Sequence, residues 1–170
     1  MGSTLKPGGK RGYCDNYKTV FVQGAYNLGS VLQNFEVVTT AFNPGMFVIQ
    51  GAATVGTEQQ CKIGATGAVD VIGIAEVDFG VMKDCTVAYN LTDSAPIILY
   101  HWNWGALLRN VWSVDPGGDK GPGAFAGTTS GTSGCFKIGD LTTGANIRAQ
   151  DFVANAASDP IVAWIENYSP

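Results

Sequence analysis

Histidine is the side chain that most often carries acid–base chemistry, and this chain has one, His101. It lies in the aromatic run YHWNW at residues 100–104, where strand alternation would put His101 and Asn103 on one face. A Cys–His pair with one of the cysteines stays open, but no neighbouring motif supports it. We therefore expect a protein that is not an enzyme. A hydrolase that uses His101 with a carboxylate or a thiol is kept as an alternative.

The cysteines are widely spaced and contain no CxxC pair. A zinc site would have to combine distant residues with the single histidine, so we expect none. Buried or half-buried thiols are the simplest interpretation. In an oxidising compartment three disulfide pairings are open, and the sequence does not rank them. The four residues are Cys14, Cys61, Cys85 and Cys135.

Loop carboxylates offer the other candidate metal ligands. Asp115 and Asp119 flank a Pro-Gly-Gly segment, and Asp140 follows further on. Calcium prefers such oxygen ligands, but two loop acids four residues apart are also common in plain turns. The chain has neither a phosphate-binding loop nor a dinucleotide-binding fingerprint. We predict no cofactor and no bound metal.

The composition favours a turn-rich β protein. The 170 residues are 45% apolar, enough for a core, yet only 14% charged, with 23 Gly and 7 Pro. So few charges suggest that a partner covers part of the surface. A net charge of −4 argues against nucleic-acid binding, and no apolar run reaches the roughly 18 to 20 residues of a membrane helix. The first ten residues lack the apolar segment of a secretory signal.

Residues 1–18 differ from the rest in charge and are expected to form a basic, extended N-terminal arm. Four cations stand against Asp15 alone, a net of +3, which leaves −7 on residues 19–170. Such a segment cannot bury apolar surface of its own, and either frays or binds a neighbour. Its aromatic side chains favour binding. The candidate partner-binding residues of the arm are Lys6, Lys10, Arg11, Tyr13 and Tyr17.

Short apolar runs separated by Gly, Pro and Asn predict an all-β fold, a small barrel or sandwich of short antiparallel strands in a single domain over residues 19–170. Residues 115–134 are rich in Gly, Pro, Ser and Thr and predict a long loop. The expected strands are 19–22, 31–40, 46–49, 69–77, 86–89, 96–104, 107–114, 135–138, 152–154 and 161–165.

Two short echoes suggest one β unit used twice. VIGIAE at residues 71–76 is similar to IVAWIE at 161–166, and CKIG at 61–64 is similar to CFKIG at 135–139. The two echoes have different spacings, so they do not establish a duplication. Glu76 and Glu166 end apolar strands, and we expect them to face solvent.

An aromatic cluster is the strongest physical feature of the sequence. Four large rings lie within 13 residues and could bury several hundred Å². They could fill the core, form a contact surface, since Trp and Tyr dominate binding hot spots, or make a platform for sugars. The four are Tyr100, Trp102, Trp104 and Trp112, and the three tryptophans are candidate partner-binding residues.

Four segments together resemble the small β-rich decoration, or cement, proteins of tailed-phage capsids. These are the strand NPGMFV at residues 43–48, the strand VIGIAE at 71–76, the segment APIIL at 95–99 and the closing stretch 147–166. The resemblance covers residues 40–170 and rests on short motifs. The Trp-rich strand, the 115–134 loop and the Cys-bearing arm depart from the family pattern.

The resemblance implies a structural virion protein on the capsid exterior, made in the host cytoplasm. Its partner would be the major capsid protein, and it would be a homo-oligomer, with a trimer favoured, that binds neither nucleic acid nor membrane. Two other classes remain open. One is a carbohydrate-binding or adhesive β-sandwich that uses the tryptophans, and the other is a self-assembling coat or filament subunit.

Overall fold

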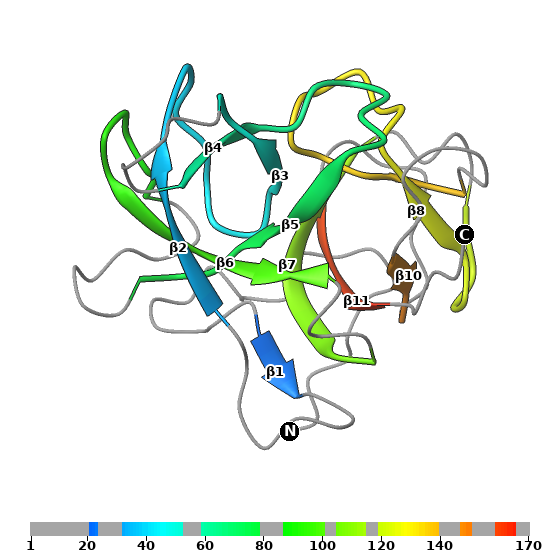
Figure 1. Ribbon diagram of the computed structural model, residues 1–170. Helices are drawn as coiled ribbons and strands as arrows, with labels where there is room; N and C mark the ends of the chain where they lie inside the picture. The colour runs from blue at the N-terminus through cyan, green and yellow to red at the C-terminus, as the bar shows by residue number, and fades with distance from the viewer. Residues whose placement is uncertain are drawn as a thin grey trace.

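The structure is a computed structural model that describes residues 21–23, 32–52, 59–78, 87–100, 105–114, 119–139, 147–150 and 159–165. These residues form an all-β fold, as the sequence predicts, and none of them belongs to an α-helix. No helix in the described part could therefore cross a membrane. Figure 1 shows two β units side by side, with β2 to β6 on one side and β8, β10 and β11 on the other.

The strands of the described part are short. In chain order they are β1 (Phe21–Gln23), β2 (Leu32–Val37), β3 (Phe47–Gln50), β4 (Gln60–Ile63), β5 (Val71–Ala75), β6 (Ser94–Leu99), β7 (Leu107–Ser113), β8 (Phe125–Gly127), β9 (Lys137–Ile138), β10 (Ile147–Ala149) and β11 (Asp159–Ile165).

The first unit, which we call the first barrel, is closed in the strand order β2-β4-β3-β5-β6. Only the β2–β4 pair is parallel, and the other pairs are antiparallel. Alternate residues of a strand point to opposite faces, so one set from each strand fills the interior. Phe42 and Tyr89, which pair in an isolated bridge, join this set. The interior residues are Phe35, Val37, Phe42, Val48, Cys61, Ala75, Tyr89, Ala95, Ile97 and Leu99.

The other strands form a sheet in the order β1-β7-β11-β10-β8-β9. This sheet curls until the residue before β9 meets the end of β7 through a parallel bridge between Ser113 and Phe136. Phe136 N–H donates to the Trp112 carbonyl at 2.8 Å, and Val114 N–H donates to the Phe136 carbonyl at 2.9 Å. Strands β7 to β11 thus close on themselves and make the second unit, with β1 paired to β7 outside it.

The two units have the same topology. In each, the first strand pairs in parallel with the third and antiparallel with the fifth, and the second strand pairs with both the third and the fourth. The registers match Phe47 with Phe125 and Lys62-Ile63 with Lys137-Ile138. The chain is therefore a tandem repeat of one five-stranded unit.

Hydrogen bonds at the turns repeat with the strands. Gly45 N–H donates to the Ala75 carbonyl at 2.8 Å, and Gly123 N–H donates to the Ala149 carbonyl at 2.8 Å. Both glycines follow a proline and have φ of +87°, a backbone conformation that glycine adopts without a steric penalty. These turns therefore hold the same geometry in two otherwise different sequences.

The structural repeat shows which of the two sequence echoes joins equivalent positions. The Lys-Ile-Gly echo joins equivalent positions, since Gly64 N–H donates to the Phe47 carbonyl and Gly139 N–H to the Phe125 carbonyl, at 3.1 and 2.6 Å. The pairing of 71–76 with 161–166 is wrong, because β5 is equivalent to β10 and β6 to β11.

The structure differs from the sequence-based prediction at several strands. Of the expected strand at 86–89 the structure describes residues 87–89, and of these Tyr89 alone is paired, in an isolated bridge with Phe42. The predicted 115–134 loop is wrong at β8, which pairs with both β9 and β10. Strands β4 and β10 were not expected, and each is completed by long-range pairing with strands of its own unit. The arm, residues 1–18, and the expected strand at 152–154 lie outside the described residues.

The units share one hydrophobic core. Side chains that point out of the first barrel, among them Phe47, Ile49, Ile74 and Ile98, cluster with those that fill the second unit. The Phe47 and Phe136 rings have centroids 4.8 Å apart. The contact between the units is thus continuous with the interior of the second unit.

Candidate interaction surfaces

Of the predicted partner-binding residues, the structure describes Trp112. Lys6, Lys10, Arg11, Tyr13, Tyr17, Trp102 and Trp104 lie outside the described residues, as does His101.

Trp112 lies on β7, half-buried, where the second unit meets the first barrel. Its Nε1–H donates to the Pro44 carbonyl at 3.0 Å, and its backbone N–H donates to the Gly45 carbonyl at 3.1 Å. Its indole thus uses its single donor inside the chain. This geometry gives Trp112 a role in joining the units, and leaves its N–H unable to bind a sugar.

The backbone of β7 is irregular where it passes the Gly45 turn. Asn110 has φ of +64° and is buried, at the point where the register between β7 and β11 shifts. A β-bulge of this kind re-aims a strand. Here the Asn110 carbonyl comes so close to Gly45 that a side chain at position 45 would overlap it.

Residues 128–134 make a second connection between the units. Thr128 Oγ1–H donates to the Ala68 carbonyl at 2.6 Å, and Gly67 N–H donates to the Thr128 carbonyl at 2.8 Å. Thr66 Oγ1–H donates to the Ser130 carbonyl at 2.8 Å. Gly131, Thr132 and Ser133 are exposed at the tip of the same segment. The segment therefore binds the first barrel at its base and presents its tip to solvent.

The first barrel has an outer face made by three side chains of β3, β5 and β6. Phe47, Ile74 and Ile98 are each 0% exposed, because the second unit packs on them. We call them the first outer face. The strand registers place three other residues at the equivalent positions of the second unit, and we call these the second outer face: Phe125, Arg148 and Trp164.

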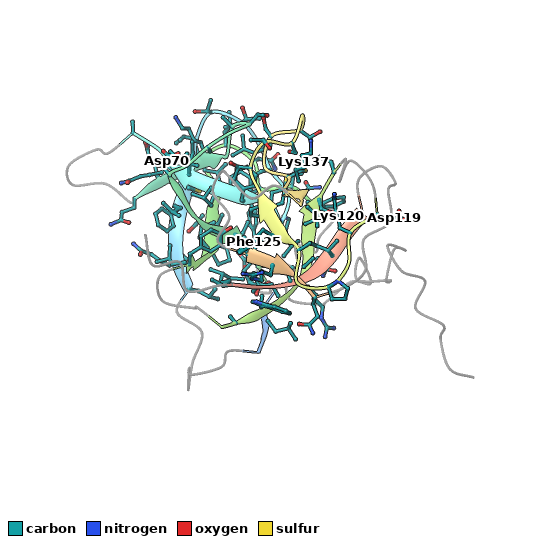
Figure 2. All side chains as sticks on the ribbon, turned by 90° about the vertical axis from the view of Figure 1, so that its right-hand side faces the viewer. Asp70, Asp119, Lys120, Phe125 and Lys137 are labelled. Carbon is teal, nitrogen blue, oxygen red and sulfur yellow. The ribbon has the colours of Figure 1, made fainter. Side chains whose placement is uncertain are left out.

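The second outer face differs from the first in chemistry. The Arg148 guanidinium lies 3.5 Å from the centroid of the Phe125 ring, and its Nη1 donates to the Gly123 carbonyl at 2.9 Å. Phe125, Arg148 and Trp164 are each half-buried. Figure 2 shows Phe125 facing the viewer, with Lys137 and Lys120 around it. This face combines aromatic surface with a fixed cation, a combination favoured in protein interfaces.

Glu76 is buried at the end of β5, so the prediction that it faces solvent is wrong. It is 2% exposed, and its Oε1 accepts a hydrogen bond from the Val77 N–H at 2.7 Å. The Tyr89 hydroxyl donates to the Glu76 carbonyl at 2.6 Å. Burial, and then the charges of Asp78 and Glu76, raise the pKa of Tyr89 well above its ordinary value. Tyr89 therefore acts here as a neutral hydrogen-bond donor inside the first barrel.

Two other buried groups are held in their neutral forms. Burial raises the pKa of Tyr100 well above its ordinary value, and Tyr100 belongs to the core shared by the units. Cys61 and Cys135 are buried free thiols, as the sequence suggests for these cysteines, and burial raises the pKa of Cys135 to about 11. Cys14 and Cys85 lie outside the described residues.

The described residues contain no group of three or more His, Cys, Asp or Glu that could hold a metal ion. Of the three loop acids named as candidate ligands, the structure describes Asp119, which is exposed. A scan of protein-family models finds no match to the chain, and a search of curated proteins also finds none.

Sequence reasoning did not identify the second outer face. Phe125 and Arg148 are 23 residues apart, and they meet because β8 and β10 pair with Phe125 opposite Arg148. The repeated Lys-Ile-Gly segment is the signal that could have found it. The Lys-Ile-Gly copies are 75 residues apart, while PGMF at 44–47 and PGAF at 122–125 are 78 residues apart, so an alignment with a three-residue gap places Phe47 on Phe125.

Proposed function

We propose that this protein is a structural virion protein, a capsid decoration or cement protein that binds the outer surface of an assembled coat lattice and stabilises it. We also propose that it acts as a homo-oligomer, with a trimer favoured. The resemblance of residues 40–170 to that family is one support.

The observation that carries the proposal is that both units are filled by apolar side chains of the chain itself. The interior of a small barrel is filled by its side chains, and larger barrels enclose ligand cavities. The interior of the first barrel contains Phe35, Phe42, Val48 and Tyr89, all of which are buried. The second unit is filled by apolar side chains such as Phe136 and Ile161. Binding is thereby left to the outer surfaces, which suits a protein that holds other proteins together.

The proposed mechanism is mass action. A protein that binds the assembled lattice, and not the separate subunits, stabilises that lattice by its binding free energy. The basic arm would reach a neighbouring subunit, by adding a strand to an exposed sheet edge. Lys6, Lys10 and Arg11 would then face acidic coat surface. A rigid tandem unit would keep the arm and the other contacts at fixed separations.

The proposal is tested by mixing the purified chain with shells assembled from the major capsid protein that is its proposed partner. We expect co-sedimentation with expanded shells and a rise in the shell's melting temperature, saturating at a fixed ratio of chain to coat. A variant that lacks residues 1–18 should bind the shells more weakly than the full chain. The difference in affinity between the two should be larger at low salt, where charge contacts contribute most. Absence of binding to expanded shells contradicts the proposal, and normal binding by the truncated variant contradicts the role of the arm.

A further inference from the structure

The positive charges of this chain are gathered in two places. Four of its ten Lys and Arg residues belong to the arm, residues 1–18. Three more, Lys120, Lys137 and Arg148, lie on or beside the second outer face. The remaining three cations share residues 19–170 with thirteen of the fourteen acids. An acidic molecule thus carries most of its cations on one segment and one face.

The strand registers place these three cations around one aromatic ring. Arg148 pairs with Phe125 across β10 and β8. Lys137 pairs with the residue two positions along β8 from Phe125, so it points to the same face of the sheet. Lys120 lies against Gly139, whose N–H donates to the Phe125 carbonyl at 2.6 Å. The ring of Phe125 is therefore bordered by positive charge.

The charge of this face is not neutralised by described acids. Lys120 and Lys137 are half-buried, and among the described residues no carboxylate forms an ion pair with either. In Figure 2, Asp119 lies beyond Lys120 as seen from Phe125, and Asp70 lies on the other side. A partner that covers Phe125 therefore meets the two lysines before it meets these acids.

The arm and the second outer face belong to the same sheet. Residues 1–18 lead into β1, which pairs with β7. The registers define one row of residues across four strand pairs: Gln23, Leu107, Trp164, Arg148 and Phe125. The row puts β1 two strand spacings, about 10 Å, from Trp164. A partner that binds the cationic arm is therefore placed to bind the cationic face as well.

We infer that the second outer face binds an extended acidic segment of the coat protein. Its carboxylates would contact Arg148 and the two lysines, and its aliphatic carbons would contact Phe125 and Trp164. The inference rests on the proposed function for the source of the segment, and on the charge of the face for its chemistry. The arm of this chain is excluded as the occupant, because it is itself positive. Nucleic acid carries a charge on every nucleotide, and the −7 of residues 19–170 opposes so dense a polyanion.

Arg148 is held in position for this contact. Its guanidinium lies 3.5 Å from the centroid of the Phe125 ring, and its Nη1 donates to the Gly123 carbonyl at 2.9 Å. A guanidinium can donate two parallel hydrogen bonds to one carboxylate, which makes it the preferred partner of such groups. Because the side chain is fixed before a partner arrives, less entropy is lost on binding.

The test measures binding of a fluorescein-labelled, glutamate-rich peptide to the full chain by fluorescence anisotropy. Lys120→Glu with Lys137→Glu reverses two charges of the face, and Lys137→Glu reverses one. Lys62→Glu is the matched control, because Lys62 is also half-buried and holds the position in the first barrel that Lys137 holds in the second unit. The arm is intact in every variant, so its contribution is the same in all. Far-UV circular dichroism reports folding.

We expect the double variant to bind the peptide at least tenfold more weakly than the wild type, and Lys62→Glu to bind it within twofold. The difference should shrink as salt is added. Bound peptide should shift the tryptophan emission of the wild type, and Trp164→Phe should remove that shift. Co-sedimentation with shells of the major capsid protein should rank the variants in the same order.

Four results contradict the inference. Equal losses in Lys62→Glu and Lys137→Glu would show that net charge, and not this face, controls binding. An oligothymidylate that competes as well as unlabelled peptide would make the face a general anion site. A double variant that loses the peptide but binds shells like the wild type would remove the coat as partner, while the proposed function stands. A wild type that binds the peptide but no shells would remove the proposed function, and with it the coat as the source of the segment.

Discussion

Cys135 links the stability of the fold to alkaline pH. Burial raises the pKa of its thiol from 9.0 to about 11. Between these values the unfolded chain has lost a proton that the folded chain keeps. The stabilisation from keeping this thiol neutral is therefore fully present below pH 9. It is lost as the pH rises from 9 to 11, which lowers the free energy of unfolding by about 2 kcal/mol. Urea unfolding at pH 8 and at pH 10.5 should show this loss in the wild type.

Cys135→Ala supplies the comparison for this prediction. The variant lacks the thiol, so its free energy of unfolding should fall less between the two pH values. Tyr89 and Tyr100 also have raised pKa values, but they titrate in both proteins and cancel in the difference. Equal losses in the two proteins would show that Cys135 is not held neutral by the fold.

Alanine variants at Gly45 and Gly123 distinguish the cost of backbone strain from the cost of a clash between the units. Both have φ of +87°, so alanine at either position costs about 1 kcal/mol in strain. An alanine at 45 would also overlap the Asn110 carbonyl of the second unit, whereas nothing lies within 4 Å of the added atom at 123. We expect Gly45→Ala to lower the free energy of unfolding by at least about 3 kcal/mol, and Gly123→Ala by about 1. Equal losses in urea denaturation would contradict the close approach at Gly45.

At the scale of elements, the hydrogen bonds of residues 128–134 to the first barrel should stabilise the contact between the units. Thr128 is 0% exposed, and Thr128→Val removes its hydrogen bond and leaves the Ala68 carbonyl without that partner. A loss of about 1–3 kcal/mol is expected. Thr132→Val makes the same change at an exposed position and should cost less than about 0.5 kcal/mol. Equal chemical-denaturation midpoints for the two variants would show that the Thr128 hydrogen bond does not stabilise the contact between the units.

How far the sequence predicts these elements depends on where each strand finds its stabilisation. Strands β5 and β11 contain continuous apolar runs, which are visible locally. Strand β8 has three residues, Phe-Ala-Gly, within a segment rich in glycine, and it exists because β9 and β10 pair with its two edges. Trp112 was singled out as an interface residue, but its hydrogen-bond partner, Pro44, is 68 residues away. Local composition carries no information on such pairings.

The repeat shows the same limit at the level of the whole chain. Few residues are identical at equivalent positions; examples are Pro44-Gly45 with Pro122-Gly123, where the glycines have φ of +87°, and Lys62-Ile63 with Lys137-Ile138. Elsewhere the copies differ freely, as Cys61 and Phe136 do in the two interiors. The two units thus keep the same topology while their outer faces differ in chemistry, apolar on the first and aromatic with a cation on the second.

The shared core predicts that the whole molecule unfolds as one cooperative unit. Phe47 belongs to the first barrel by its strand, yet it is 0% exposed within the core of the second unit, 4.8 Å from the Phe136 ring. Scanning calorimetry should give one transition with equal calorimetric and van't Hoff enthalpies.

Phe47→Ala opens a cavity at the junction and should lower the free energy of unfolding by about 3–5 kcal/mol. Because the loss falls on the contact itself, the transition should broaden or split. Phe125→Ala removes the same ring from the equivalent but half-buried position, so it should cost less and leave a single transition. Two separate transitions in the wild type would mean that the units are independent domains and that the core they share does not couple them.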